Sequence, residues 1–256
     1  MRRWQGKYVI GLTGNIATGK SVVRKMLEHL GAYGIDADAL AHRAMAKGAP
    51  GYTLVLKAFG DWILDEEGQI DRGRMAKIAF SDPDALQKLE TIVHPLVAHA
   101  VDLLIRRAKQ SVVVIEAIKL LESDLASGCD PVWVVDSTED LQIARLMHKR
   151  NMSEAAARQR IAAQSPQAMK LRAAKVVLRN DGSFEDTWNQ VQVAWGKLPR
   201  VEEAYLPPPP VTRPGQLIVR RGRPQDADDI ARFITRVSHG KKRMTRQDVM
   251  AAFGEK

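Results

Sequence analysis

Gly14-Asn15-Ile16-Ala17-Thr18-Gly19-Lys20-Ser21 is the stretch of sequence that decides the fold. It fits the pattern G-x-x-x-x-G-K-[ST], in which backbone N–H groups curl around an anion at the start of a helix. The apolar run Tyr8–Leu12 predicts a buried strand before the loop, and Ser21–Leu30 predicts a helix after it. This strand–loop–helix context favours a phosphate-binding loop over a Gly-rich turn before an ordinary helix.

The loop predicts nucleotide binding. In such a loop the lysine, here Lys20, reaches the β- and γ-phosphates of ATP, and the hydroxyl of Ser21 ligates Mg²⁺. The predicted nucleotide-binding residues are the loop itself and the next residue of the helix: Gly14, Asn15, Ile16, Ala17, Thr18, Gly19, Lys20, Ser21 and Val22.

Strand and helix patterns alternate from Lys7 to about Leu198, which predicts an α/β fold with a parallel sheet covered by helices. Residues 112–115 are apolar and β-branched at every position, as is typical of a strand covered on both faces. Three more strands are expected, one ending at Ile35 and the others over 132–135 and 175–178. A helix is predicted to start near residues 137–140, and the pattern stays helical from 141 to 164.

Residues 39–110 form a long, mostly helical insertion between the second and third strands. Such an insertion normally covers the acceptor in small-molecule kinases, so the acceptor subsite is placed here. Within it, His94 lies on an apolar helical pattern and is interpreted as structural. The neighbouring Pro95 is expected to set either a kink or a helix start.

Asp36 and Asp38 follow the second strand, and ligands of open parallel sheets sit at this edge, the carboxyl ends of the strands. A carboxylate there can accept the proton of an acceptor hydroxyl or help to hold Mg²⁺ through water. A purely local role is also open, because Asp is a natural N-cap. We assign capping to Asp36 and chemistry to Asp38.

Arginines after the fourth strand are the third candidate group. A guanidinium can neutralise the charge that phosphoryl transfer spreads over the γ-phosphate oxygens. Arg145 and Arg150 are the best candidates for this role. The alternative is a solvated helix face with ordinary surface arginines.

Composition limits the remaining possibilities. The single cysteine, Cys129, excludes an internal disulfide framework, and no His/Cys cluster has the spacing of metal ligands. The sequence shows no signal peptide and no apolar stretch long enough to span a membrane. A cytoplasmic address is therefore expected. The net charge is +9, but residues 211–256 carry +6 of it. The basic character is therefore mostly a property of the tail and does not indicate nucleic-acid binding by the main domain.

The region from Lys7 to Leu198 resembles the bacterial dephospho-CoA kinases. The shared features, specific in their order and spacing, are Ile10–Gly14 leading into the loop, Ile35–Asp38, Gly48–Gly51, Phe59-Gly60, Ile70–Arg72, Ile92–Leu96, Arg158–Gln164 and the Asn180-Asp181-Gly182 turn. The resemblance implies a P-loop NTPase-type sheet and transfer of the ATP γ-phosphate to the ribose 3′-hydroxyl of dephospho-CoA, giving CoA.

The resemblance also implies individual roles. Asp38 matches the catalytic base, and Arg145 matches an arginine that contacts the ATP phosphates. Arg150 falls in a mobile lid, about residues 145–165, and Asn180 and Gly182 lie near the adenine. The acceptor-binding insertion contains Asp71, Arg72 and His94.

Three departures from the family pattern are present. Asn15 and Ala17 stand where the family's loop usually or often has Gly, but neither is a fixed position of the general motif. Lys119 replaces a Pro beside the acceptor site, and the Glu that follows falls one position early. Lys119 would add a cation near the substrate phosphates, or it would mark a kinase for another small acceptor such as a nucleoside or nucleotide. A non-catalytic nucleotide-binding module is the third possibility.

The tail begins beyond a break at Pro207–Pro210, which favours an extended spacer. We expect a kinase-like domain over 7–200, a linker over 201–216 and a segment over 217–256 with helical patterns at 224–237 and 245–253. Residues 218–230 resemble the opening strand and helix of a GCN5-related acetyltransferase. Since only that opening is present, no acetyltransferase activity is expected. The chain is expected to be either a fragment of a longer fusion with a further acetyltransferase domain or a kinase that carries a remnant of such a domain.

Overall fold

A computed structural model describes residues 3–199, 226–237 and 245–252. Its centre is a parallel sheet of five strands in the order β2-β3-β1-β4-β5. The strands are β1 (Tyr8–Thr13), β2 (Tyr33–Asp36), β3 (Val112–Glu116), β4 (Val132–Asp136) and β5 (Val176–Arg179). The five strands predicted between residues 7 and 198 are confirmed, and the parallel pairing places all five carboxyl ends at one edge of the sheet.

The three central strands of the sheet, β1, β3 and β4, are buried on both faces, as their apolar sequences predict. On one face, Ile10, Val114 and Trp133 pack against α1 (Lys20–His29) and α9 (Phe184–Gly196). On the other face, Val9 and Val113 pack against the long helix α5 (Pro83–Arg107). Successive residues of one strand therefore serve opposite cores, which is the period of two that a strand imposes.

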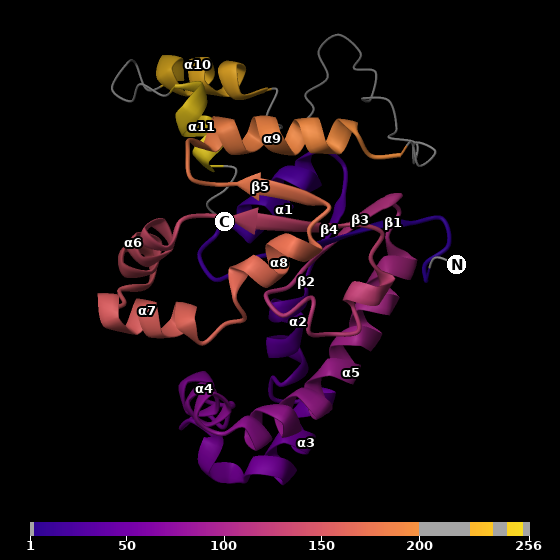
Figure 1. Cartoon of the computed structure of the whole chain (residues 1–256), viewed down its shortest axis with the longest axis vertical. Coiled ribbons are helices and arrows are strands. Elements are labelled where there is room, and N and C mark those ends of the chain that lie inside the picture. The colour runs from indigo at the N-terminus through magenta and orange to yellow at the C-terminus, as the bar shows by residue number, and fades with distance from the viewer. Residues whose placement is uncertain (1–2, 200–225, 238–244, 253–256) are drawn as a thin grey trace.

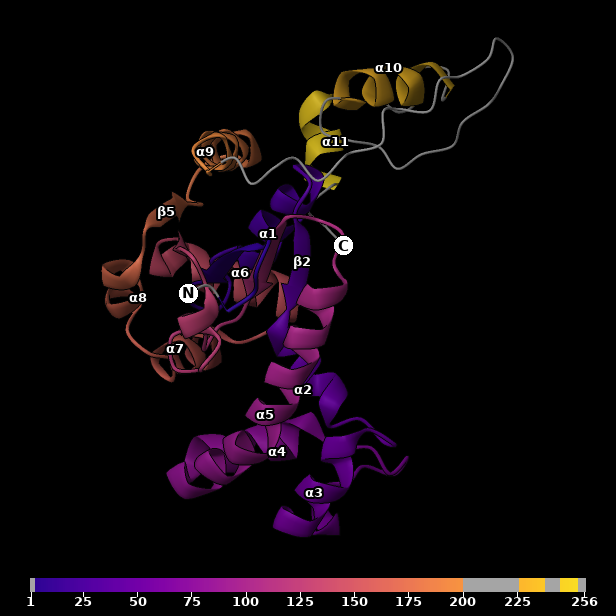
Figure 2. The same cartoon turned by 90° about the vertical axis from the view of Figure 1, so that its right-hand side faces the viewer.

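The insertion between β2 and β3 is mostly helical and extends away from the sheet (Figures 1 and 2). It comprises α2 (Ala37–Ala44), α3 (Pro50–Phe59), a short 3-10 turn (Asp61–Ile63), α4 (Arg72–Ser81) and α5. A small separate core around Val55, Ile63 and Met75 holds its outer end together. Pro95 lies inside α5, so the expected alternative of a helix start at Pro95 is wrong.

Residues 141–164 do not form one continuous helical run, contrary to the sequence pattern. Helix α6 (Glu139–Arg150) ends at Asn151, whose φ of 49° is left-handed, and α7 (Glu154–Ala162) begins anew at Ser153. The Ser153 hydroxyl caps α7 by accepting from the Ala156 N–H at 3.2 Å. A third helix, α8 (Gln167–Ala173), then leads to β5.

The described part of the tail forms α10 (Ala227–Val237) and α11 (Arg246–Ala252), close to the two predicted helices. Ala227, Ala231 and Val249 are buried in the core cluster that also contains α1 and α9. The opening strand of the acetyltransferase-like stretch and the spacer at 207–210 lie outside the described residues. No helix in the described ranges is long and apolar enough to cross a membrane.

Candidate active site

The loop between β1 and α1 has the strand–loop–helix setting that its sequence predicts, with α1 beginning at Lys20. Gly14 and Gly19 have φ values of 147° and 101°, in the region that side chains rarely adopt. A Cβ on Gly14 would lie 2.3 Å from the Val135 carbonyl oxygen, and one on Gly19 would lie 2.1 Å from Nδ2 of Asn180. Both glycines are therefore required by backbone conformation and by close approach.

The loop offers donors to an anion. Among the described residues, the N–H groups of Ala17, Gly19, Lys20 and Ser21 have no hydrogen-bond acceptor. Free N–H groups at a helix N-terminus are the arrangement that binds phosphate.

Two amides near the start of the loop are already occupied by side chains. The Asn15 N–H donates to Oε1 of Gln167 at 3.0 Å, and the Ile16 N–H donates to Oε1 of Gln164 at 2.9 Å. Both glutamines belong to the connection that runs from α7 into α8, so this connection lies against the loop.

Lys20 is 6% exposed, and its ammonium donates to the main-chain oxygen of Asn15 at 3.0 Å. Burial lowers the pKa of Lys20 to about 8, while Glu116 and Asp38 act in the opposite direction. The side chain of Lys20 therefore folds back onto the loop at Asn15, and the carboxylates of Glu116 and Asp38 lie near it. Val22 is partly buried against the core, and its N–H donates to the Gly19 oxygen at 3.0 Å.

Ser21 faces a carboxylate at the end of β3. Its hydroxyl donates to Oε1 of Glu116 at 2.6 Å, and Nε of Arg24 donates to the other Glu116 oxygen at 2.6 Å. Glu116 is only 3% exposed. A hydroxyl and a carboxylate side by side are the hard oxygen ligands that Mg²⁺ prefers, so the residues fit this ion.

No group of three or more His, Cys, Asp or Glu side chains in the described ranges could hold a metal ion. Mg²⁺ is usually bound through one or two protein carboxylates together with substrate phosphates and water, so a dedicated cluster is not needed for it.

Asp36 and Asp38 make separate contacts, and Asp36 has the capping role that its position predicts. Asp36 is the N-cap of α2 and accepts from the Ala39 N–H at 2.8 Å. Asp38 is in the first turn of α2 and accepts from the Ile118 N–H at 3.1 Å through Oδ2. Burial raises the pKa of Asp38, and the Ile118 hydrogen bond and the charge of Lys20 only partly oppose this.

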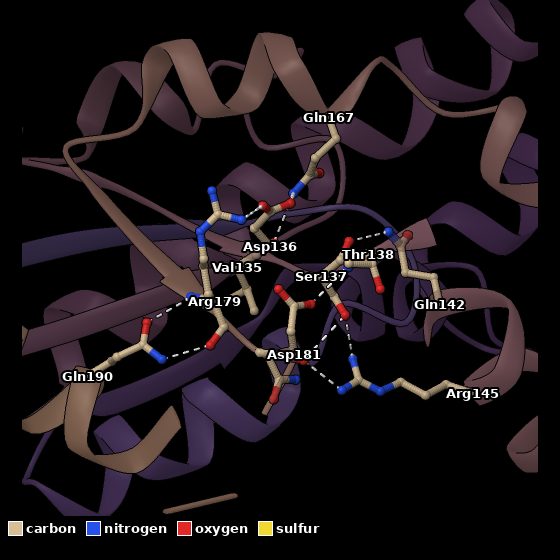
Figure 3. Close-up of polar contacts among 11 residues, drawn as sticks. Val135, Asp136, Ser137, Thr138, Gln142, Arg145, Gln167, Arg179, Asp181 and Gln190 are labelled. Atoms are coloured by element: carbon tan, nitrogen blue, oxygen red, sulfur yellow. Dashed lines mark hydrogen bonds and ion pairs between the residues drawn. The ribbon is translucent and has the colours of Figure 1, made fainter. Parts of the chain in front are cut away.

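Arg145 on α6 joins three parts of the site, and Figure 3 shows its position beside Ser137. Its guanidinium donates to the Ala17 oxygen and to Oγ of Ser137, both at 3.1 Å, and to the Asn180 oxygen at 2.7 Å. Burial lowers the pKa of Arg145. The Asn180 side chain donates to the Thr18 oxygen at 2.8 Å, so the predicted turn at 180–182 also contacts the loop, and Gly182 lies in that turn.

Several predicted residues lie elsewhere. Arg150 is exposed at the end of α6 and has no ion pair among the described residues. Asp71 caps α4 by accepting from the N–H groups of Gly73 and Arg74, and Arg72 is the first residue of that helix. His94 is exposed on α5. Helix α4 lies at the outer end of the insertion, away from the sheet edge, in both views (Figures 1 and 2).

Lys119 follows β3 and is half-exposed. Its ammonium donates to Oε1 of Glu90 on α5 at 2.6 Å. The positive charge of Lys119 is therefore matched by a negative charge on the insertion.

One known protein family matches most of this chain. A family model for dephospho-CoA kinase matches residues 8–186. The chain belongs to the dephospho-CoA kinase family. A dephospho-CoA kinase of Geobacter metallireducens is 40% identical over 190 residues, which span 73% of this chain and 94% of that protein. One of Streptomyces avermitilis is 40% identical over 199 residues, covering 77% and 96%.

A solved structure supports the fold of this kinase. The crystal structure of TT1252 from Thermus thermophilus aligns with a TM-score of 0.65 at 30% identity, covering 75% of this chain and 98% of that one. About three quarters of the present chain thus accounts for nearly the whole of its relatives. The additional residues are those of the tail, whose resemblance to acetyltransferases stays a prediction.

Sequence reasoning about the kinase site missed Glu116, Lys170 and Gln167, and it named Gln164 only as part of a family motif, without its contact to the loop. An acidic residue at the end of the all-apolar strand 112–115 was an available signal for Glu116. Lys170 gave no such signal, because a lysine in a helix is ordinarily expected to be exposed. Cys129 needs no role at the site, because burial raises the pKa of its thiol to about 12.

Proposed function

We propose that this chain transfers the γ-phosphate of ATP to the ribose 3′-hydroxyl of dephospho-CoA, with Mg²⁺ as cofactor. One observation carries the proposal. A loop with free amide donors, the buried Lys20 and the buried carboxylate of Asp38 meet at the carboxyl edge of the sheet, close enough for Lys20 and Asp38 to affect each other's pKa. Phosphoryl transfer needs this combination of an anion cradle and a base for the attacking alcohol.

Asp38 acts as the base in this proposal. Its carboxylate takes the proton of the ribose hydroxyl as the oxygen attacks the γ-phosphorus. A raised pKa strengthens an aspartate as a base, since its usual value lies far below neutral pH. The hydrogen bond from the Ile118 N–H keeps one carboxylate oxygen fixed and leaves the other for the substrate.

Lys20 and Arg145 supply positive charge to the nucleotide in the proposed mechanism. Lys20 exchanges its contact with the Asn15 oxygen for the β- and γ-phosphates, and Arg145 approaches them from α6 on the far side of the loop. Ser21 and Glu116 would hold Mg²⁺, which neutralises developing charge on the phosphate oxygens when bound. The turn containing Asn180 and Gly182 is proposed to border the adenine.

The insertion over residues 39–110 is the proposed acceptor subsite. The proposed domain division is a kinase domain over residues 7–200, a linker over 201–216 and then the tail. Asp71, Arg72, His94 and Lys119 stay candidates for acceptor contacts. The Lys119–Glu90 ion pair weakens the argument for a different acceptor, because Lys119 already has a partner. Arg150 is proposed to belong to a lid of about residues 145–165 that closes on the nucleotide.

A panel of acceptors tests the proposal. The full chain is incubated with Mg-ATP and either dephospho-CoA, adenosine or AMP, and products are identified by mass spectrometry. The expected result is CoA and ADP from the first acceptor and little transfer to the other two. A higher kcat/KM for an acceptor that lacks the pantetheine arm would overturn it, as would ATP binding without transfer to any of them.

A further inference from the structure

Lys170, in the middle of α8, is a buried cation to which the proposed mechanism gives no part. It is 1% exposed, among the most buried side chains of the described residues. A lone ammonium is costly to bury, so its position requires compensating contacts. Burial lowers the pKa of Lys170, whereas Glu122 and Asp38 favour its charged form and Lys119 opposes it.

The contacts of Lys170 join the two halves of the site. Its Nζ donates to the side-chain oxygen of Asn15 at 2.9 Å and to the main-chain oxygen of Ile118 at 2.9 Å. Asn15 is part of the phosphate loop, and its main-chain oxygen accepts from Lys20. The N–H of Ile118 is the group that holds Asp38. One ammonium thus ties the phosphate cradle to the segment that positions the base.

Asn15 makes this link possible in the present chain. A glycine at this position would provide no side-chain oxygen for Lys170. The Asn15 amide also donates to the Ser165 oxygen at 3.3 Å, and its backbone N–H donates to Gln167. The asparagine at position 15, in place of a glycine, therefore makes several contacts with the α7–α8 connection.

We infer that Lys170 is a positioning residue for phosphoryl transfer, which fixes the phosphate loop relative to Ile118 and Asp38. The inference rests on the proposed function. Transfer between two bound reactants depends steeply on their separation, and a displacement of about 1 Å can cost on the order of 100-fold in rate. Lys170 contacts the loop at Asn15, whereas the free amides that would bind phosphate follow later in the loop. Loss of Lys170 should therefore lower the rate of the transfer step more than the affinity for the nucleotide.

Lys170→Met tests the inference, since it keeps the length of the side chain and removes the ammonium. The expected result is a kcat lowered about 10- to 100-fold with the KM for ATP changed less than about threefold. Lys170→Arg, which retains a cation and donors, should recover part of the lost kcat. Arg172→Met is the matched control, because Arg172 is an exposed cation on the same helix, and its kcat should equal that of the unaltered chain.

Rates are normalised to the folded fraction measured by near-ultraviolet circular dichroism. A kcat for folded Lys170→Met within threefold of the unaltered chain would overturn the inference, as would a change in KM alone. If Lys170→Met does not fold, Asn15→Ala decides instead, since it removes one of the two acceptors. It should lower kcat while the Kd for ATP stays within about threefold, and an unchanged kcat would overturn the inference. Failure of the unaltered chain to form CoA would instead count against the proposed function.

Discussion

At the scale of single residues, local chemistry was predictable and long-range contacts were not. The N-cap role of Asp36 follows from its position just before a helix, and the structure confirms it. The partners of Ser21 and Lys170 are Glu116 and Asn15, which lie 95 and 155 positions away in sequence. No short-range pattern encodes such pairs, because they depend on which strands become neighbours in the sheet.

The pKa of Asp38 gives a prediction at this scale. Burial raises it above the usual 3.8, and a protonated carboxyl cannot accept the proton of the alcohol. Activity should therefore be lost as pH falls through this raised value and be retained above it. We expect the acid limb of kcat, measured at saturating Mg-ATP, to have its midpoint clearly above 3.8. A flat profile down to the ordinary aspartate range would contradict the base role, provided that circular dichroism shows the protein still folded.

At the scale of elements, the five strands and the first helix were predictable from periodicity and from the loop motif. The break between α6 and α7 was missed, although its local signals are present: Asn151 follows the basic last turn of α6, and Ser153 is an N-cap for α7. Asn151 adopts a φ of 49° and ψ of 36°. Asn and Gly tolerate this conformation, whereas a β-branched residue is strongly disfavoured in it.

Two substitutions at this break should differ in the size of their effect on stability. Asn151→Val is expected to lower the free energy of unfolding by about 1–2 kcal/mol, the cost of a left-handed conformation for such a residue. Asn151→Gly should leave stability unchanged within about 0.5 kcal/mol. Urea denaturation measures both. Equal stability of the two variants would show that the break does not depend on the left-handed residue.

At the scale of the whole molecule, the tail is where sequence reasoning was least informative. Its two helices were expected, but their packing was not, because the apolar faces of short helices do not specify a partner. Ala231 and Val249 are buried in the same core as α1 and α9, and Arg246 forms ion pairs with Glu185 and Asp228. The tail therefore packs on the face that α9 covers, and Figure 1 shows it at the end of the molecule opposite the insertion.

Removal of the tail should separate stability from catalysis. A chain ending at Arg200 loses the buried contacts of α10 and α11, so its Tm should fall by several degrees, at roughly 2–4 °C for each kcal/mol lost. Its kcat should stay within about twofold, because the family relatives correspond to only about three quarters of this chain. Val249→Asp in the full chain is the matched control, because it places a charge in the buried contact of α11 without shortening the chain. A large loss of kcat in the shortened chain would assign the tail a part in catalysis.

The pair Asp38→Asn and Asp36→Asn tests most directly the claim that a carboxylate beside the phosphate loop activates the acceptor alcohol. Both substitutions remove one negative charge, and Asn preserves the N-cap at position 36. Single-turnover transfer from γ-labelled ATP to dephospho-CoA should slow by about 10²–10⁴-fold in Asp38→Asn, with the Kd for ATP nearly unchanged, and by less than about tenfold in Asp36→Asn. Transfer by Asp38→Asn at the rate of the unaltered chain would contradict the account.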